Sequence, residues 1–446
     1  MEPTSGRGSR PRLTVLGTGY LGATHAVCMA ELGFEVLGLD VDEHKIALLQ
    51  SGEVPFFEPG LPELLRKNLE TGRLRFTTSF EEVGAFGDVH FLCVGTPQKQ
   101  GEFAADMTYV DACFRALVPQ LRDGALVVGK STVPAGTAER LAAELARTCP
   151  AADVELAWNP EFLREGFAVE DTLTPDRLVF GVSSEAAEAK LRAAFAPVLE
   201  LPTPLVVTDF ATAQLVKVAA NAFLATKISF INAMAEVCEA TGGDVTMLSK
   251  ALGYDSRIGG RFLHAGLGFG GGCLPKDIRA FMARAGELGV DQALSFLREV
   301  DAINLRRRAR MVDLARELVG GSFGGMRVGV LGAAFKPNSD DIRDSPALDV
   351  AAAIQRQGAA VTLYDPAAMD NARARCPELG YRESAIEAAR GADIVLHLTE
   401  WSEFRQMDPT TLSDVVASRR IVDGRNALDP AQWRAAGWTY RALGRP

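Results

Sequence analysis

The chain has 446 residues, 47% hydrophobic and 23% charged, a composition typical of a globular protein with two or three domains. Its formal net charge of −10 disfavours nonspecific binding of nucleic acid, so an anionic ligand must be met by local cations. No apolar run reaches the length of a membrane span. Residues 1–11 lack the apolar core of a signal peptide and are predicted to form a flexible leader.

The seven cysteines are scattered through mostly apolar segments and lack the paired spacing of metal ligands. This pattern favours a reducing cytosol and predicts no metal site. We therefore expect a cytoplasmic protein that does not contact a membrane.

A glycine pattern follows the first predicted strand. The apolar segment 13–16 leads into Gly17, Gly19 and Gly22, spaced as Gly-x-Gly-x-x-Gly, and an apolar helical segment comes next. In this context the first glycine permits a tight turn, the second lets backbone N–H groups approach a pyrophosphate, and the third lets helix and strand pack closely. The segment is predicted to bind a dinucleotide.

An acidic residue ends the second predicted strand. The segment 34–39 leads into Asp40, at the spacing of the acid that binds the adenosine ribose hydroxyls. Because a carboxylate there would repel a 2′-phosphate, the sequence favours NAD over NADP. The alternative, a turn that binds no cofactor, is disfavoured by the ordered set of strand, glycines, helix, strand and acid.

Strands and helical stretches then alternate, which is typical of a mostly parallel sheet. In such a sheet, ligands lie beyond the carboxyl ends of the strands. Thr96, Thr132 and Glu161 each follow a predicted strand and are candidates for a site at that edge, although threonine and proline are also common in ordinary turns. The predicted strands are 89–94, 126–130, 154–158 and 177–181.

A long helix is predicted over 210–241, a stretch without glycine or proline in which apolar residues recur with the helical period. Lys217 and Asn221 lie four residues apart and therefore on one face of this helix. Among so many apolar neighbours, Lys217 either extends its ammonium to solvent or is held in a polar pocket.

The run 268–277, Gly-Phe-Gly-Gly-Gly-Cys-Leu-Pro-Lys-Asp, combines a nucleophile, a helix start and an acid. Pro275 suits the first turn of a helix. Cys273 would then lie at the positive end of the helix dipole with Lys276 beside it, and both favour a thiolate. Asp277 is predicted to reach back to the same pocket. The alternative is a structural cysteine in a tight glycine turn.

A second α/β unit begins near Met326 and echoes the first without its glycine fingerprint. Its basic and hydroxyl groups, which include Lys336 and Arg425, suggest a phosphorylated ligand rather than a second NAD. Loop salt bridges are the alternative interpretation of these charges. The predicted strands are 327–332, 360–365, 392–398 and 420–423.

Taken in order, these segments resemble the UDP-glucose/GDP-mannose dehydrogenase family of nucleotide-sugar 6-dehydrogenases over essentially the whole chain after the leader. The resemblance is closest to members that oxidise UDP-glucose. The matching segments are 17–22, 95–97, 131–134, 159–166, 268–277, 335–337 and 423–426, together with Lys217 and Asn221.

The resemblance implies an α/β fold of two Rossmann-like doubly wound domains joined by a long central helix, with a small helical middle domain. It implies a NAD-binding domain over 12–208, a central dimerisation domain over 209–320 and a nucleotide-sugar-binding domain over 321–446. It also implies NAD as cofactor, UDP-glucose or a related nucleotide sugar as substrate, and a homodimer or higher homo-oligomer.

A mechanism is implied as well. Cys273 would carry a thiohemiacetal and then a thioester while the C6 alcohol of the sugar loses four electrons. Asp277 would act as a base, a threonine and a glutamate would hold a water, and a lysine and an asparagine would stabilise negative charge on oxygen. The implied catalytic set is Cys273, Asp277, Lys217, Asn221, Glu161 and Thr132.

Two binding sets carry over from the family. Arg257 matches an arginine that in this family reaches the substrate of the neighbouring subunit. The implied cofactor residues are Gly17, Gly19, Tyr20, Leu21, Gly22, Asp40, Lys45, Thr96, Thr132, Glu165 and Lys276. The implied substrate residues are Glu161, Phe162, Leu163, Lys217, Asn221, Arg257, Phe262, Leu263, Gly270, Phe335, Lys336 and Arg425.

Two residues depart from the family pattern. His264 stands where a lysine or asparagine is more usual, and Gly272 stands where serine usually precedes the cysteine. Neither removes a catalytic group, but both border the implied nucleotide-sugar site. The same double oxidation of another nucleotide sugar, such as dTDP-glucose, GDP-mannose or a UDP-acetamidosugar, stays open, as does a protein that only binds nucleotide sugars. A two-electron hydroxyacid dehydrogenase would lack the cysteine loop.

Overall fold

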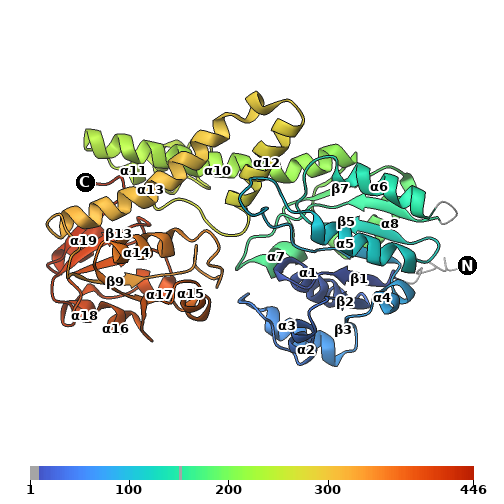
Figure 1. Cartoon of the computed structure of the whole chain (residues 1–446), viewed down its shortest axis with the longest axis horizontal. Coiled ribbons are helices and arrows are strands. Elements are labelled where there is room, and N and C mark those ends of the chain that lie inside the picture. The colour runs from blue at the N-terminus through green and yellow to red at the C-terminus, as the bar shows by residue number, and fades with distance from the viewer. Residues whose placement is uncertain (1–9, 150–152) are drawn as a thin grey trace, which may run out of the picture. The chain divides into compact units, whose positions relative to one another are not determined.

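The computed structural model describes residues 10–149 and 153–446 (Figure 1). Apart from its last two residues, the predicted leader 1–11 therefore lies outside the described residues. The chain divides into two compact units, Met1–Ala219 and Ala220–Pro446, each with its own sheet. Helix α10 (Phe210–Thr241) crosses this division, and the predicted three-domain boundaries stay a prediction.

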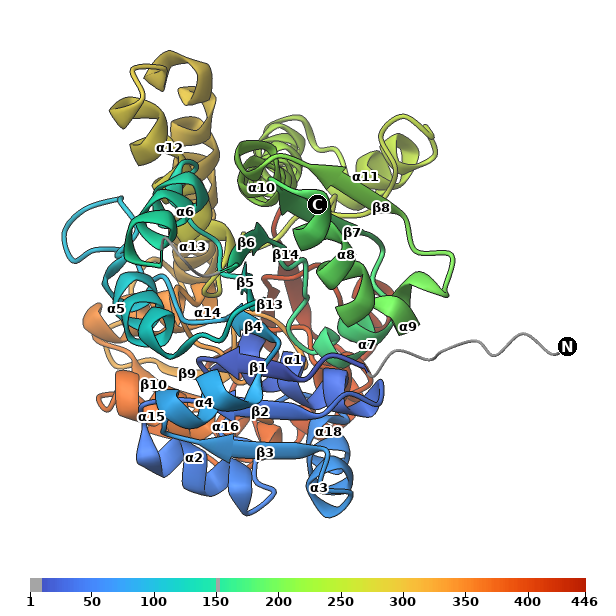
Figure 2. The ribbon, with the colours of Figure 1, turned by 90° about the vertical axis from the view of Figure 1, so that its right-hand side faces the viewer.

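The first unit contains an eight-stranded sheet in the order β3-β2-β1-β4-β5-β6-β7-β8. Strands β1 to β6 pair in parallel in the order 3-2-1-4-5-6 of a doubly wound dinucleotide-binding fold, and β7 pairs antiparallel with β6. Figure 2 shows β3, β2, β1 and β4 following one another across this sheet. The strands are β1 (Leu13–Leu16), β2 (Val36–Leu39), β3 (Leu74–Thr77), β4 (Val89–Leu92), β5 (Leu126–Gly129), β6 (Glu155–Trp158), β7 (Leu178–Val182) and β8 (Leu205–Thr208).

Apolar residues cover both faces of this sheet. Leu13 and Val15 belong to one core and Leu16 to another, because successive side chains of a strand point to opposite faces. Burial on both faces explains why the central strands are mostly apolar. The helices of this unit are α1 (Tyr20–Glu31), α2 (Glu43–Gln50), α3 (Leu61–Glu70), α4 (Phe80–Phe86), α5 (Thr108–Leu117), η1 (Val118–Gln120), α6 (Thr137–Thr148), α7 (Ala168–Leu173), α8 (Glu185–Ala194) and α9 (Ala196–Leu199).

The second unit contains a six-stranded parallel sheet in the order β11-β10-β9-β12-β13-β14. This is again the order 3-2-1-4-5-6, so the prediction of two Rossmann-like folds is confirmed. The strands are β9 (Arg327–Leu331), β10 (Ala360–Tyr364), β11 (Gly380–Tyr381), β12 (Ile394–His397), β13 (Arg420–Asp423) and β14 (Thr439–Ala442). The helices that follow α10 are α11 (Val245–Gly253), α12 (Leu274–Glu287), η2 (Asp291–Leu294), α13 (Phe296–Leu318), α14 (Pro346–Arg356), α15 (Met369–Arg375), α16 (Ala385–Ala389), α17 (Ser402–Arg405), α18 (Pro409–Ser413) and α19 (Pro430–Ala435).

Helix α10 has the bounds that the sequence predicts. By length and composition alone it is long and apolar enough to cross a membrane, so the prediction that no run has this length is wrong. Its most apolar window is 44% buried, and the same composition occurs in core helices of soluble proteins. In the second unit α10 packs against α13, where the Ser229 hydroxyl donates to the carbonyl oxygen of Val300 over 2.7 Å (Figure 1).

Candidate active site

Thr96 and Thr132 lie side by side at the carboxyl edge of the first sheet. Thr96 follows β4, and Thr132 follows the neighbouring strand β5. The buried Thr96 hydroxyl donates to the carbonyl oxygen of Thr132 over 2.7 Å. The fold thus brings together two predicted residues that are 36 positions apart in the sequence.

The glycine pattern forms the predicted tight turn. Gly17 has a φ of +88°, which favours glycine, and a Cβ on Gly22 would collide with the carbonyl oxygen of Gly17. Gly19 lies at the N-cap of α1 and provides no side-chain cap, and Tyr20 and Leu21 open the helix without an acidic residue in the first turn. Backbone N–H groups at such a helix start suit a pyrophosphate, so this corner fits a dinucleotide.

Asp40 lies buried at the end of β2. It accepts the N–H of Thr18 over 2.8 Å, and the Lys45 ammonium lies 2.9 Å from the same oxygen. Burial alone would raise the pKa of Asp40, but Lys45 and the backbone N–H groups outweigh it and hold this pKa below its ordinary value. The resulting carboxylate is a pure acceptor, which fits the ribose hydroxyls of NAD.

Glu58 is a site residue that the sequence analysis missed. This buried carboxylate accepts hydrogen bonds from the Tyr20 hydroxyl and, over 2.7 Å each, from the N–H groups of Gly166 and Ala168. Burial and the Glu58 carboxylate both raise the pKa of Tyr20. These bonds tie the loop that contains Glu165 to the start of α1. The available signal was an acidic residue in an apolar, proline-bounded segment.

Lys217 and Glu161 form a buried ion pair, with Lys217 Nζ 2.9 Å from Glu161 Oε1. Lys217 is 4% exposed, so the alternative of an ammonium that extends to solvent is wrong. The second oxygen of Glu161 accepts the N–H of Leu163 over 2.6 Å, and the Phe162 ring lies 5.8 Å from Lys217 Nζ. Because an unpaired buried charge is costly, each of these groups needs an oppositely charged partner at this position.

Cys273 occupies the N-cap position of α12, with an exposed side chain and no disulfide. Pro275 lies in the first turn, as predicted, and the N–H of Asp277 donates to the Cys273 carbonyl oxygen over 2.9 Å. The thiol therefore lies at the positive end of a 14-residue helix, where the dipole favours a thiolate. The prediction of a helix start at this cysteine is confirmed.

Asp277 lies almost fully buried, at 1% exposure. The Lys276 ammonium lies 2.6 Å from its Oδ1, and the Asn221 amide donates to its Oδ2 over 2.6 Å. Both carboxylate oxygens are thus engaged by neighbours, and Lys276, a predicted cofactor residue, pairs with the predicted base. In α10, Lys217 lies one turn before Asn221, as the spacing predicts.

Arg425 ties three loops of the second unit together. Its guanidinium donates to the carbonyl oxygens of Leu398, Gly268 and Phe335 over 2.8, 3.0 and 2.9 Å. Burial lowers the pKa of Arg425, and Glu400, 3.3 Å away, opposes that shift. This predicted substrate residue therefore also has a structural role.

The other predicted substrate residues of the second unit lie in its loops. Phe335 and Lys336 stay together, with Lys336 Nζ 5.4 Å from the Phe335 ring. Leu263 and Gly270 are buried, whereas Phe262 adopts a φ of +63°, which is rare for an aromatic residue and typical of binding loops.

Arg257 differs from these residues because its side chain is 87% exposed and pairs with Asp255 over 2.6 Å. Of the two departures from the family pattern, His264 is exposed. A Cβ at Gly272 would collide with the guanidinium of Arg343, so this arginine fills the space that a serine side chain would need.

The second sheet lacks a dinucleotide corner at the position equivalent to Asp40. Asp365, which follows β10, accepts the N–H groups of Ala333 and Ala334 over 2.7 and 3.0 Å, and the Trp401 indole donates to it over 3.1 Å. Its acceptors are therefore used within the protein. Helix α14 also has a side-chain cap, from Ser345, so its start is less suited to a pyrophosphate than that of α1.

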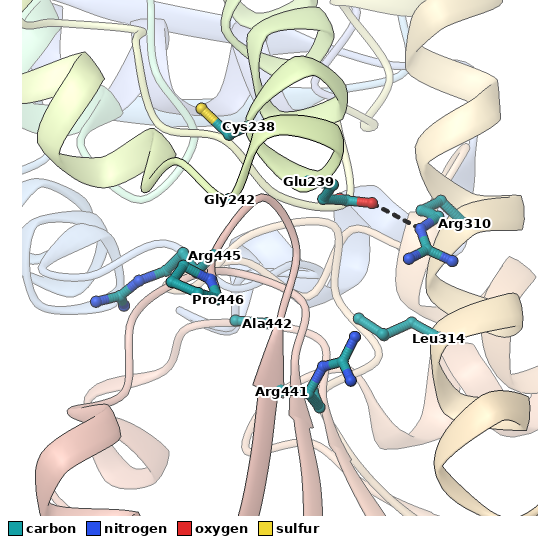
Figure 3. Close-up of a pocket in the computed structure, with 9 residues that line it drawn as sticks. All are labelled: Cys238, Glu239, Gly242, Arg310, Leu314, Arg441, Ala442, Arg445 and Pro446. Atoms are coloured by element: carbon teal, nitrogen blue, oxygen red, sulfur yellow. Dashed lines mark hydrogen bonds and ion pairs between the residues drawn. The ribbon is translucent and has the colours of Figure 1, made fainter.

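A cavity of about 340 Å³ in the second unit contains none of the predicted site residues (Figure 3). Arg310 pairs with Glu239 over 2.7 Å and Arg445 with Asp244 over 3.3 Å, so most of its charges are already neutralised. Within residues 10–149 and 153–446, no three His, Cys, Asp or Glu side chains gather as metal ligands. The cavity is lined by Cys238, Glu239, Gly242, Arg310, Leu314, Arg441, Ala442, Arg445 and Pro446.

Comparison with known proteins assigns the chain to a family. Residues 11–199 match the UDP-glucose/GDP-mannose dehydrogenase family, NAD binding domain, 211–306 match its central domain, and 329–430 match its UDP binding domain. The chain belongs to this family. The resemblance seen in the sequence is thus confirmed, and the first unit contains the family's NAD binding domain.

Similar members of the UDP-glucose/GDP-mannose dehydrogenase family span the whole chain. A UDP-glucose 6-dehydrogenase of Rhizobium meliloti is 41% identical over 437 residues, covering 98% of this chain and 100% of that protein. The structure of a UDP-glucose dehydrogenase from Pyrobaculum islandicum has a TM-score of 0.90 at 38% identity and covers 99% of both chains. A UDP-D-ManNAc dehydrogenase from Pyrococcus horikoshii has a TM-score of 0.84 at 27% identity, covering 97% of this chain and 99% of that one.

Lys130, which the sequence analysis also missed, supports a loop of the family's NAD binding domain. It follows β5, is 6% exposed, and donates to Asn159 Oδ1 over 2.8 Å. Its ammonium lies 5.9 and 5.5 Å from the rings of Phe91 and Phe195. Burial lowers the pKa of Lys130 to about 8. Since Asn159 precedes Pro160 and Glu161, this bond steadies the start of the glutamate loop.

Replacement of Asp40 tests the cofactor site. Asp40→Ser should weaken NAD binding by about 10- to 100-fold, because a charged hydrogen-bond acceptor is lost. It should also reduce the preference for NAD over NADP. Titration with each nucleotide measures the ratio of the two dissociation constants. Asp42→Ser, which removes a nearby carboxylate, is the matched control, and an unchanged ratio in Asp40→Ser would contradict the assignment.

Lys130→Met tests the buried lysine. Its pKa in the folded protein, about 8, lies below the ordinary value of about 10.4. The folded state therefore loses this proton first, and the wild type should gain stability over the variant as the pH rises from about 8 to 10, by up to about 3 kcal/mol. Unfolding midpoints at several pH values measure the difference. Lys250→Met, at an exposed lysine, is the control, and its difference in stability from the wild type should not change with pH. A difference that is likewise independent of pH for Lys130→Met would contradict the lowered pKa of Lys130.

Proposed function

We propose that this protein is an NAD-dependent dehydrogenase that oxidises the C6 alcohol of UDP-glucose to a carboxylate, giving UDP-glucuronate. The observation that carries the proposal is Cys273, an exposed thiol at the start of α12, one turn before a buried Asp277 that Asn221 and Lys276 hold. Family membership and full-length similarity to proteins named for UDP-glucose support the choice of substrate.

The reaction removes four electrons from C6 in two oxidations. NAD, when bound, supplies the hydride acceptor for both. In the first oxidation the alcohol loses its hydroxyl proton to a base, for which Asp277 is the candidate, and becomes an aldehyde. A planar aldehyde has no hydride to release, so C6 must first become tetrahedral again.

Cys273 makes the second oxidation possible. Its thiolate forms a C–S bond to C6, and the aldehyde oxygen takes up a proton to give a thiohemiacetal. Loss of a hydride and of the hydroxyl proton leaves a thioester. Water then breaks the C–S bond, so the carboxylate leaves and the thiol is restored with release of a proton.

The polar groups around these steps have complementary roles. Lys217 and Asn221 would stabilise negative charge on the C6 oxygen, a role that suits a buried ammonium and an amide. Glu161 pairs with Lys217 and, with Thr132, would hold the water. In the UDP binding domain Lys336 and Arg425 are the candidates for the diphosphate and the sugar.

The alternative is the same reaction on another nucleotide sugar. Uracil and thymine differ by one methyl group, worth only about 1–3 kcal/mol of discrimination in an apolar pocket. A protein that only binds nucleotide sugars would not need the thiol of Cys273, the pair of Lys217 with Glu161, or Asp277.

NADH yield tests the function. With limiting UDP-glucose, the absorbance of NADH should show two NADH per sugar. The same yield is measured with dTDP-glucose, GDP-mannose and UDP-N-acetylglucosamine as alternative substrates. Two NADH from another sugar alone would change the substrate and keep the mechanism. A yield of one from the wild type would contradict the four-electron reaction.

Cys273→Ser tests the covalent step in the same assay. This variant should bind NAD and UDP-glucose yet fail to release UDP-glucuronate, with an aldehyde-level or ester adduct visible by mass spectrometry. Cys376→Ser is the control because its half-buried thiol lies outside the proposed site. Full activity of Cys273→Ser would exclude the thioester.

We further propose a homodimer formed through α10. Phe223, Phe230 and Val237 recur every seven residues on this helix and are 66, 48 and 52% exposed. Such a stripe of large apolar side chains is typical of an interface. Arg257, whose exposed side chain pairs with the nearby Asp255, would then reach the substrate of the neighbouring subunit, as the family resemblance implies.

Light scattering tests the dimer. Phe223→Glu with Phe230→Glu should shift the mass from dimer to monomer and reduce activity, because a buried charge opposes the interface. Leu288→Glu, at a residue 55% exposed outside α10, is the control. A double variant of unchanged mass would contradict the interface.

We also propose a cytoplasmic protein that does not insert in a membrane. The cysteines of the described residues form no disulfide, which supports a reducing compartment. The polar residues of α10, among them Lys217 and Asn232, oppose insertion. After cell lysis without detergent, the protein should be recovered in the soluble fraction; recovery with membranes would contradict this.

A further inference from the structure

The backbone just before Cys273 is buried and therefore needs hydrogen-bond partners from its surroundings. Residues 265–271 are all buried and belong to neither a helix nor a strand. Buried backbone N–H and C=O groups need hydrogen-bond partners, and a segment without secondary structure cannot supply them itself. Side chains from other elements of the second unit must therefore hold this loop.

Asn304 meets this requirement at Phe269, four residues before the cysteine. The N–H of Phe269 donates to Asn304 Oδ1 over 2.7 Å, and Asn304 Nδ2 donates to the Phe269 carbonyl oxygen over 2.9 Å. Asn304 lies in α13 and is 0% exposed. One amide thus replaces both hydrogen bonds that a neighbouring strand would make.

Gly268 shows how closely the loop fits this amide. Its φ is +88°, and a Cβ there would collide with Asn304 Oδ1. The backbone can therefore approach Asn304 because residue 268 has no side chain. The glycine run that the sequence shows before the cysteine is, at this position, a consequence of Asn304.

The other contacts of the loop are single bonds, and one of them, from Arg308, shares the Phe269 carbonyl oxygen over 3.3 Å. Arg425 donates to the Gly268 carbonyl oxygen over 3.0 Å, and the N–H of Gly271 donates to the carbonyl oxygen of Arg343 over 2.8 Å. Among the contacts described for 265–272, Asn304 is the side chain that engages both polar groups of one residue.

We infer that Asn304 is a positioning residue that sets where the Cys273 thiol lies relative to the substrate carbon. This inference rests on the proposed function. Asn304 acts through the loop backbone, since its amide is used by Phe269. A displacement of about 1 Å at a reacting group costs on the order of 10²-fold in rate, so loss of both bonds should be felt at the sulfur.

Only the second oxidation needs Cys273. An effect of Asn304 on the position of the thiol can therefore be distinguished from a general loss of protein stability. The first oxidation turns an alcohol into an aldehyde without a C–S bond. The second requires the thiolate to reach C6. A misplaced thiol should therefore slow the second oxidation selectively, whereas a protein that is merely less stable loses both in proportion.

Asn304→Ala tests this inference in a single turnover, with NAD in excess and enzyme in excess of UDP-glucose. The variant should form the first NADH at a rate within a few-fold of the wild type and the second about 100-fold more slowly. Quenched samples should contain the 6-aldehyde, which hydroxylamine captures as an oxime. Ser229→Ala, which removes a buried hydrogen bond between α10 and α13, is the matched control and should keep the wild-type ratio of the two rates.

Equal slowing of both oxidations by Asn304→Ala would overturn the inference, and so would two NADH at wild-type rates. If the alanine variant does not fold, Asn304→Asp takes its place. This variant keeps the oxygen that accepts the Phe269 N–H but places a second oxygen against the Phe269 carbonyl oxygen. The same selective slowing of the second oxidation is expected. Failure of the wild type to form two NADH would refute the proposed function instead, so the two failures are distinguishable.

Discussion

The organisation of this protein depends on the cost of burying charge. Lys217, Asp277 and Asp40 are each less than a tenth exposed, and all three must be ionised to act as proposed. An isolated ion at such a position would lose its charge instead. Each therefore lies beside an opposite charge: Glu161, Lys276 and Lys45 respectively. A buried ion pair is weak evidence for stability, but it gives each buried charge an opposite charge where little water can reach it.

The two sheets show how one topology serves two ligands. Each has the strand order 3-2-1-4-5-6, and each has an aspartate after the second strand of that order. Asp40 accepts the N–H of Thr18 and pairs with the Lys45 ammonium, beside a helix start that has no side-chain cap. Asp365 instead receives backbone N–H groups of the loop after β9 and the Trp401 indole, which leaves it to organise the protein. Both aspartates accept backbone N–H groups of the loop after the first strand, and they differ in their side-chain partners, Lys45 for Asp40 and Trp401 for Asp365.

Sequence patterns predicted the interior strands well and the edges poorly. The unpredicted strands β3, β8, β11 and β14 are the outermost strands of the two sheets. A central strand of a parallel sheet is covered on both faces and reads as a continuous apolar run. An edge strand such as β3 or β14 places exposed residues between buried ones, and β8 has no buried residue. Such short segments do not stand out from loops.

The sequence by itself determined the local features of the site. These are the glycine turn, the acid after the second strand, the length of α10 and a cysteine at a helix start. Those features depend on local geometry, which spacing along the chain specifies. Tertiary structure decided which groups are paired and buried. Glu58 and Lys130 each serve partners more than 25 positions away, and Asn304 holds a loop 35 positions before it. Such contacts depend on how elements pack, because hydrogen bonds of buried groups are completed by whichever side chains the fold brings near.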